Sequence, residues 1–238
     1  MSENFSRRTL LALTGGFLVS AKSMLAAPEA PASLDHILLG ASDLEQGIAF
    51  VEKGTGVRAA AGGSHPGAGT RNALLSLGTQ RYLEIIAPDL EQAAQANALH
   101  SNLATLAEPR LVGWASHTGD IAAVAKRLAV AGIAADGPND GSRVRPDGKT
   151  LRWKTLRLED DRGGLLPFFI EWSRDTVHPS VDAPHGERLG SLVMESPNVA
   201  ELRDVFQKLG IEAPVRAGVK SRLLARIAGP RGSMEMTS

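Results

Sequence analysis

The sequence predicts a mixed α+β fold that is built from repeated βαβββ units. Three segments, which begin at Leu34, Leu111 and Leu189, share one plan: a short apolar strand, an Asp or Asn residue that can cap a helix, an amphipathic helix and a glycine. The three caps lie 77 and 78 residues apart along the chain. Further strands, rather than a crossover helix, follow each of the three helices. This internal repeat predicts the architecture of the chain.

The composition is that of an ordinary globular protein. The 238 residues carry 26 Lys and Arg against 26 Asp and Glu, and 43% of them are hydrophobic, which excludes wholesale disorder, collagen and coiled coil. The zero net charge argues against a nucleic-acid partner, and no polybasic stretch indicates a lipid surface. Because the chain has no cysteine, disulfides, thiolate metal sites and cysteine nucleophiles are excluded.

The first 27 residues resemble an export signal. A pair of arginines, Arg7 and Arg8, precedes a short apolar run, and a stretch of small residues ends at Ala27. This order is typical of a removable signal peptide, and the paired arginines resemble the twin-arginine type. The apolar run is too short for a stable membrane span. We therefore expect a signal peptide over residues 1–27 and a periplasmic mature protein; the alternative is an amphipathic N-terminal helix.

The first unit, with a linking helix at its end, is expected over residues 33–108. Its helix begins after the cap Asp43, and its last two strands are expected over residues 73–77 and 82–87. The linking helix is expected over residues 90–106 and leads to the next unit.

The second unit is expected over residues 109–175, and a partial third unit over residues 187–238. Asp120 and Asn198 cap their helices. The strands expected after these helices cover residues 151–158, 168–172, 223–227 and 234–236. The segments rich in Pro, Gly and Asp, which are expected to form loops, cover residues 137–148 and 175–186.

Three ionisable side chains lie inside apolar strands. His36 belongs to the first strand of the first unit, and Glu84 and Glu171 belong to the last strands of the first and second units. A buried ionisable group costs free energy unless it is paired or binds a metal. If these strand faces converge, one imidazole and two carboxylates form a site that suits divalent Zn, Fe, Mn or Ni. The alternative is structural: a core histidine with satisfied hydrogen bonds, and glutamates that pair with arginines on neighbouring strands.

A glycine-rich segment over residues 62–72 is a second candidate site. Its glycines allow backbone amides to approach a ligand, Arg71 can bind a carboxylate or phosphate, and His65 can act as a ligand or proton shuttle. The alternative is a flexible hairpin loop in which Arg71 pairs with a nearby acid. Trp114 either lines an aromatic pocket with His117 at its rim or belongs to the core.

These segments resemble a known family. The stretches that carry the resemblance are LDHILLGASDLEQGIAFVEKGTGV from Leu34, HPGAGTRNALLSLGTQRYLEIIAPD from His65 and LPFFIEW from Leu166. Together they are similar to the glyoxalase-like domain of the vicinal oxygen chelate superfamily. The resemblance implies paired βαβββ modules, a cup-shaped mixed sheet flanked by helices, and a divalent metal inside the cup. It implies lyase, isomerase or dioxygenase activity, alongside metal-free binding and resistance proteins.

The resemblance also implies a set of metal ligands. His36 and Glu84 match the ligands of the first module, and Glu171 matches the last-strand ligand of the second. One position departs from the family pattern, because Gly113 stands seven residues before the second helix cap, where a first-strand ligand is expected. Three ligands with open coordination positions remain, an arrangement that suits a Lewis-acid or oxygen-activating metal.

The expected function is that of a metal-dependent lyase, isomerase or dioxygenase that acts on a small oxygenated metabolite. Arg71 and Asn72 would orient the substrate, with His65 and Trp114 alongside, and Glu171 would move a proton as the catalytic residue. The alternative is a metal-free protein of the same fold that binds a small molecule. A small-molecule substrate is thus the expected partner, and a homodimer is an open alternative.

Overall fold

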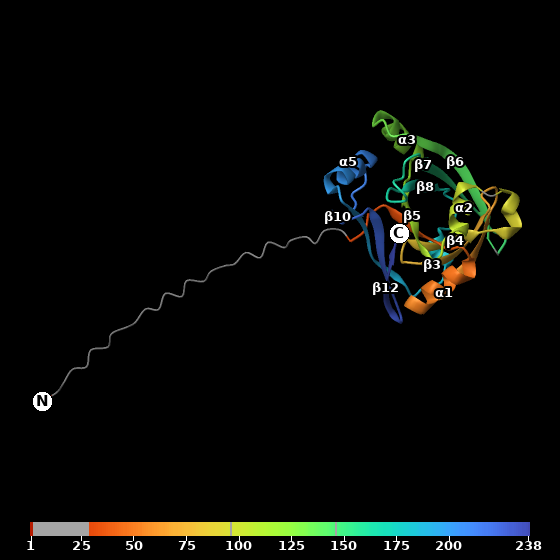
Figure 1. Cartoon of the computed structure of the whole chain (residues 1–238), viewed down its shortest axis with the longest axis horizontal. Coiled ribbons are helices and arrows are strands. Elements are labelled where there is room, and N and C mark those ends of the chain that lie inside the picture. The colour runs from red at the N-terminus through yellow and green to blue at the C-terminus, as the bar shows by residue number, and fades with distance from the viewer. Residues whose placement is uncertain (2–28, 96, 146) are drawn as a thin grey trace.

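The computed structural model contains an eight-stranded sheet and a four-stranded sheet (Figure 1). It describes Met1 and residues 29–95, 97–145 and 147–238. The predicted signal peptide over residues 1–27 therefore lies outside the described residues, except for Met1. In the described part of the chain, no helix has the length and apolar character that a membrane crossing requires.

The first unit contains a capped helix between strands. Asp43 accepts a hydrogen bond from the backbone N–H of Gln46 at the start of α1, and Gly56 ends the helix with a φ of 93°. The loop predicted over residues 62–72 is instead largely a hairpin of β2 and β3. That prediction was wrong because β2 is an edge strand of small residues, without the apolar alternation of a buried strand. The elements are β1 (Leu34–Gly40), α1 (Leu44–Thr55), β2 (Ala60–His65), β3 (Thr70–Ser76) and β4 (Tyr82–Pro88).

The second unit repeats the same order of elements. Asp120 caps α3 by accepting the backbone N–H of Ala123. The loop predicted over residues 137–148 was wrong for most of its length, because β6 pairs with β7 there. As the other edge strand of the sheet, β6 tolerates glycine and proline that a central strand would not. The elements are β5 (Arg110–His117), α3 (Ile121–Val130), β6 (Ala135–Val144), β7 (Thr150–Leu158) and β8 (Phe168–Trp172).

Short helices connect the units. The predicted linking helix forms as a 3₁₀ helix, η1 (Leu90–Gln95), and a separate helix, α2 (Ala98–Ala104), which Asn97 caps. The segment 175–186, predicted as a loop, contains the short helix α4 (Pro179–Asp182).

The third unit has the same order of elements but a different order of strands. In its sheet the order is β10-β9-β11-β12, so the first strand of the unit lies inside the sheet and the last strand lies at its edge. In the first unit, by contrast, the first and last strands pair directly. The elements are β9 (Arg188–Ser196), α5 (Val199–Leu209), β10 (Val215–Ala217), β11 (Arg222–Gly229) and β12 (Gly232–Thr237).

The first two units share the eight-stranded sheet. Its strand order is β2-β3-β4-β1-β5-β8-β7-β6, and the antiparallel pairing of β1 with β5 joins the two units at the centre. Within each unit the first strand pairs in parallel with the last. Figure 1 shows that the sheet curls into a half-barrel with helices around it. The predicted α+β fold with a cup-shaped sheet is confirmed.

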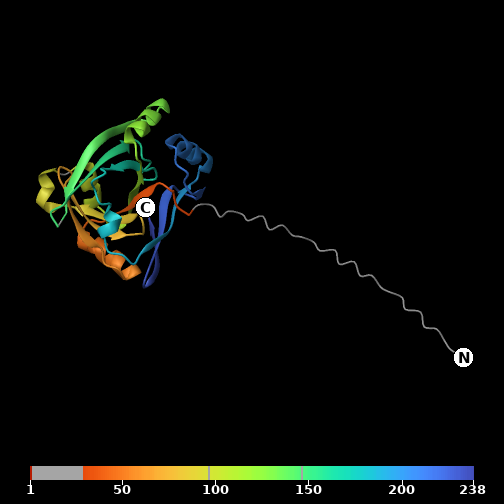
Figure 2. The ribbon, with the colours of Figure 1, turned by 180° about the vertical axis from the view of Figure 1, so that it is seen from behind.

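The main hydrophobic core lies on the outside of this half-barrel. Figure 2 shows α1, α3 and the third unit around the sheet. Trp114 of β5 is fully buried in this core, and its ring centroid lies 6.3 Å from that of Phe206 in α5. Because side chains alternate along a strand, the outer positions supply this core and the inner positions face the concave side.

Candidate active site

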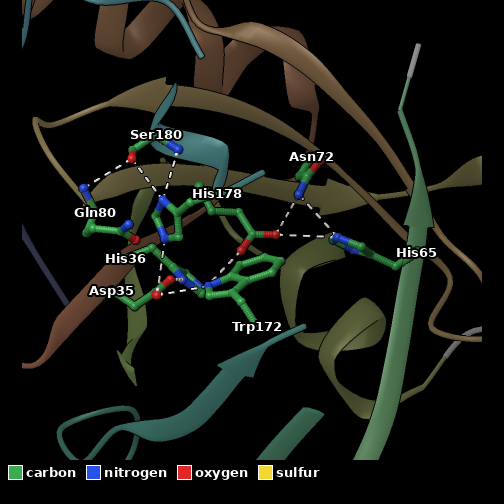
Figure 3. Close-up of polar contacts among 9 residues, drawn as sticks. Asp35, His36, His65, Asn72, Gln80, Trp172, His178 and Ser180 are labelled. Atoms are coloured by element: carbon green, nitrogen blue, oxygen red, sulfur yellow. Dashed lines mark hydrogen bonds and ion pairs between the residues drawn. The ribbon is translucent and has the colours of Figure 1, made fainter. Parts of the chain in front are cut away.

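A chain of buried polar side chains begins in β1, on the concave face. A register shift between Leu34 and His36 in the pairing of β1 with β5 allows the adjacent side chains of Asp35 and His36 to meet on one face. His36 Nδ1–H donates to Asp35 Oδ1 at 2.7 Å. On the other side of the ring, His36 Nε2 lies 3.3 Å from Glu84 Oε2 of β4. Asp35, His36 and Glu84 thus form a continuous chain across two neighbouring strands (Figure 3).

Two further side chains hold the outer end of this chain. Trp172 Nε1–H donates to Asp35 Oδ2 at 3.0 Å, and His178 Nε2 lies 3.2 Å from the same oxygen. Because the backbone N–H of Ser180 donates to His178 Nδ1, the proton of the neutral ring is on Nε2, which donates to Asp35. Burial opposes ionisation of Asp35, but the hydrogen bonds from His178 and His36 outweigh it and hold the pKa of Asp35 well below its usual range.

Asn72 and His65 surround the inner end of the chain at Glu84. Asn72 Nδ2 donates to Glu84 Oε1 at 2.8 Å and lies 3.1 Å from His65 Nε2. His65 Nδ1 lies 2.9 Å from Thr70 Oγ1. Burial lowers the pKa of His65, although the charge of Glu84 raises it. The imidazole of His65 is therefore neutral at pH 7, with Nδ1–H donating to Thr70 and Nε2 accepting from Asn72.

Glu84 is the accessible end of the chain. Its side chain is 9% exposed, against 2% for His36 and Asp35. Burial alone would raise the pKa of Glu84, but the neighbouring His36, the hydrogen bond from Asn72 and the positive charge of Arg143 lower it below its ordinary value. Glu84 is thus an ionised carboxylate at neutral pH that can act as a base.

Aromatic rings surround the His36–Glu84 pair. The ring of Tyr82 stacks on that of His36 at 4.5 Å between centroids, and Phe168 meets the same ring edge-on at 5.5 Å. Trp153 and Trp172 pack against each other at 5.5 Å on the same face. Burial raises the pKa of Tyr82 well above its ordinary value, so its hydroxyl stays neutral. These rings lower the local dielectric around the carboxylate and strengthen its electrostatic interactions.

Four of the site residues expected from the sequence come together here: His36, Glu84, His65 and Asn72. Glu171 does not join them. In β8 it alternates with Phe168 and Trp172, which face the concave side, and its Oε2 accepts the backbone N–H of Ile121 at 2.6 Å, at the start of α3. Glu171 therefore lies on the outer face, where it caps a helix.

Arg71 and Trp114 also lie outside the cluster. Arg71 is adjacent in β3 to Asn72, which faces the cluster, so strand alternation directs Arg71 to the opposite face. Trp114 lies in the core, where its Nε1–H donates to the backbone oxygen of Leu165 at 3.1 Å. The interpretation of Trp114 as a pocket residue is thus corrected in favour of its core alternative.

The three expected metal ligands do not meet at one point. His36 and Glu84 are neighbours, but Glu171 faces α3. Within residues 29–95, 97–145 and 147–238, no group of three or more His, Asp or Glu side chains is arranged to hold a metal ion. The amide of Asn72, which presents N–H groups rather than its oxygen, stands between His65 and Glu84. The residues in this arrangement do not fit a three-ligand metal centre.

Sequence reasoning missed further residues of the site, among them Asp35, Arg143, Arg157, Trp172 and His178. Asp35 was missed because it is adjacent to His36 in a strand, where the side chains of adjacent residues ordinarily face opposite sides of the sheet. Arg157 follows Trp153 by four positions in β7, so both face the concave side, and its guanidinium carbon lies 4.3 Å from the ring centroid of Phe168. The alternation of Trp153, Thr155 and Arg157 was the available sequence signal.

A larger cavity lies in the third unit. A cavity of about 880 Å³ is lined by residues of α5, β9 and β10 in the third unit, including Arg203, Phe206 and Val193. A smaller one of about 180 Å³ adjoins the concave face and is lined by Leu74, Arg143 and neighbouring residues. The concave face, which carries the buried acid–base chain and adjoins the smaller cavity, is the candidate active site.

Removal of the Glu171 side chain should reduce stability. We expect Glu171→Ala to lower the free energy of unfolding by about 1 kcal/mol, because the N–H of Ile121 at the start of α3 loses its acceptor. Chemical denaturation of the variant and the wild type measures the difference. An unchanged unfolding midpoint would contradict the capping role.

The buried neutral His65 should make stability depend on pH. Its pKa is lower in the folded than in the unfolded state, so the unfolded state binds more protons as the pH falls below about 6.5. The contribution of the neutral ring is therefore complete above that pH and is lost on acidification. We expect the free energy of unfolding to fall more steeply between pH 7 and pH 5 for the wild type than for His65→Gln, as measured by urea denaturation. Equal slopes would show that the pKa of His65 is the same in the folded and unfolded states and would contradict the buried neutral ring.

Comparisons with known proteins agree with the fold. The sequence profile of a glyoxalase-like domain matches residues 34–210. The crystal structure of a hypothetical protein from Staphylococcus aureus superimposes with a TM-score of 0.58 at 16% identity, covering 86% of this chain and 84% of that one. Methylmalonyl-CoA epimerase from Mycobacterium tuberculosis gives a TM-score of 0.45 at 22% identity, covering 63% and 94%. A search of curated proteins finds no match. The Staphylococcus aureus structure shows a shared fold.

Proposed function

Because the chain belongs to the glyoxalase-like domain family, we propose that its concave face is the active site of an enzyme that moves a proton on a small oxygenated metabolite. The observation that carries this proposal is the buried chain of Asp35, His36 and Glu84, whose accessible end is an ionised carboxylate. A buried ionisable chain with no structural ion pair to arginine or lysine is costly to maintain, and such groups gather at functional sites.

Glu84 is the catalytic residue of the proposed reaction. Its carboxylate takes the proton from a C–H bond next to a carbonyl group of the substrate. The electron pair of that bond moves onto the carbonyl oxygen and forms an enolate. When Glu84 returns the proton to the opposite face of the same carbon, the electron pair moves back to that carbon, the carbonyl group re-forms and the epimer of the substrate results. The proton and the electron pair both stay within the substrate and Glu84.

His36 and Asp35 are positioning residues for Glu84. Asp35 holds Nδ1–H of His36 at 2.7 Å, which fixes the orientation of the ring and directs Nε2 towards Glu84 Oε2. When the ring carries a proton on both nitrogens, this contact is an ion pair that holds the carboxylate beside it. Asn72 holds the other oxygen of Glu84 at 2.8 Å. Both oxygens of the base are thereby fixed before a substrate enters.

The experiment that tests the proposal is proton exchange with solvent. We expect the protein, incubated in D₂O with 2-oxobutanoate, 4-oxopentanoate or malonate, to accelerate the loss of the NMR signal of the C–H next to the carbonyl in at least one of them. The alternative, a protein that only binds small molecules, predicts changes in chemical shift without faster exchange. No acceleration with any probe would argue against the enzyme and for the binding protein.

Three expectations from the sequence stay predictions beside this proposal. Export to the periplasm rests on residues 1–27, and a homodimer rests on the family resemblance. Dependence on a divalent metal also rests on the resemblance.

A further inference from the structure

We propose that the substrate carries a carboxylate or phosphate group, which Arg143 and Arg157 bind beside Glu84. This inference rests on the proposed function, because it names the substrate class of the same site. Three observations carry it: an arginine that is buried without a partner, a second arginine across the concave face, and a small cavity that the first arginine lines.

Arg143 is a buried cation without a counter-ion. It is 4% exposed, and in the described part of the chain its Nη1 has no hydrogen-bond partner and no carboxylate lies within 4.0 Å of its guanidinium. Arg143 in β6 pairs with Leu151 in β7, and both residues line the cavity at the concave face. Burial lowers the pKa of Arg143, but a guanidinium stays charged at neutral pH. A buried charge that lacks a partner is costly, so its persistence points to a ligand that supplies the opposite charge.

The neighbouring Arg145 shows that this lack of a partner is specific to Arg143. Arg145 lines the same cavity, but it forms ion pairs with Asp147 and with Asp182. Lys149 Nζ also lies 3.9 Å from Asp147 Oδ2, so the two carboxylates at the cavity already face two cations. Among the described residues they leave Arg143 as the cation that an incoming anion would meet.

Arg157 supplies the second positive charge. Its guanidinium lies over the ring of Phe168, which itself lies 5.5 Å from the ring of His36. Within the described residues no carboxylate lies within 4.0 Å of this guanidinium either. The positive charges of Arg143 and Arg157 both depress the pKa of His65, so both arginines lie close enough to the inner end of the chain to act on it.

Space for a ligand lies beside Arg143. Arg143 lines a small cavity together with Gly62, Leu74 and Leu151. Gly62 packs closely against the side-chain oxygen of Asn72 and against Arg143 Nη1, and neither of these two atoms has a hydrogen-bond partner in the described chain. The cavity here measures about 180 Å³, which is room for about six water molecules or one small metabolite.

The two arginines also suit the proposed chemistry. A guanidinium binds a carboxylate or phosphate through paired N–H groups, which orients the substrate. When Glu84 removes the proton, negative charge develops on the enolate oxygen, and a nearby fixed cation stabilises that charge. The arginines thus bind the substrate and lower the barrier to its deprotonation.

The test measures, by calorimetry at low salt, how tightly the protein binds malonate, inorganic phosphate and the neutral malonamide. We expect malonate or phosphate to bind the wild type at least tenfold more tightly than malonamide does, and the tighter of the two anions identifies the substrate group. Arg157→Gln and Arg143→Lys should each weaken that binding at least tenfold. Arg157 is exposed, so its variant keeps the test valid if the Arg143 variant fails to fold.

Arg226→Gln is the matched control, because Arg226 is an exposed strand arginine in the other sheet. It should bind as the wild type does. Equal binding of malonamide and malonate, or unchanged binding by Arg157→Gln, would overturn the inference. Binding is measured without turnover, so the two proposals can fail separately. Anion binding without proton exchange would refute the proposed enzyme but not the anion site. Proton exchange without a preference for anions would refute the anion site but not the enzyme.

Discussion

Glu84→Gln is expected to slow proton exchange by about 10²–10⁴-fold, the usual contribution of a positioned general base. Glutamine keeps the size of the side chain and can still accept the hydrogen bond from Asn72, but it cannot take a proton from carbon. His36 and Asp35 would remain in place to hold it. The rate of deuterium incorporation into the responsive probe measures the loss, and unfolding by urea shows that the fold is retained.

Glu195→Gln provides the matched control for this substitution. Glu195 is a strand glutamate that is 7% exposed, as Glu84 is, but it lies in the four-stranded sheet and pairs with Arg216 and Arg222. The control should exchange protons at the wild-type rate. If both variants lost exchange equally, or if neither did, Glu84 would not be the base.

Trp114→Ala is expected to lower the free energy of unfolding by about 3–5 kcal/mol. The side chain is fully buried between β5 and α5, and its removal leaves a cavity and an unpaired backbone oxygen at Leu165. Urea denaturation of the variant measures the change. A loss of this size is a large share of the stability of a typical domain, so partial unfolding at 25 °C is within the expected range.

Trp153→Ala is the comparison on the concave face. Trp153 is half-buried and contacts Trp172 there, so its removal should cost less stability than the removal of Trp114. A stable Trp114→Ala variant with weakened ligand binding would restore the interpretation of Trp114 as a pocket residue.

The architecture could be predicted because its signals are local. Asp43, Asp120 and Asn198 each cap a helix as expected, and the repeat they define gives the βαβββ order. The strand β6 was missed because its glycines and proline are typical of a loop, and only its pairing with β7 makes it a strand. The strand order of the third unit also depends on tertiary packing, so it could not be predicted from the sequence pattern of that unit.

The site could be predicted in part. His36 and Glu84 were identified because ionisable residues in apolar strands need partners, and the partner of each is the other. Arg71 and Asn72 were expected together, yet adjacent residues of a regular strand face opposite sides, so only one could reach the cluster. Asp35 breaks this rule through the register shift in β1, which depends on the neighbouring β5 and is invisible in one strand.

The position of Glu171 shows why the expected metal ligands do not assemble. Its strand was predicted correctly, but the face that it presents follows from the packing of α3 against the sheet. The family resemblance identified the position of Glu171 in the sequence, but not the face of the sheet on which its side chain lies.

The most direct test of proton transfer by Glu84 is deuterium exchange by the wild-type protein before and after treatment with a chelator, with elemental analysis of both samples. We expect exchange of the responsive probe to continue at the same rate after chelation and to be lost in Glu84→Gln. Exchange that disappears on chelation and returns with Zn, Fe, Mn or Ni would contradict the metal-independent base, and would restore the metal centre that the family resemblance implies.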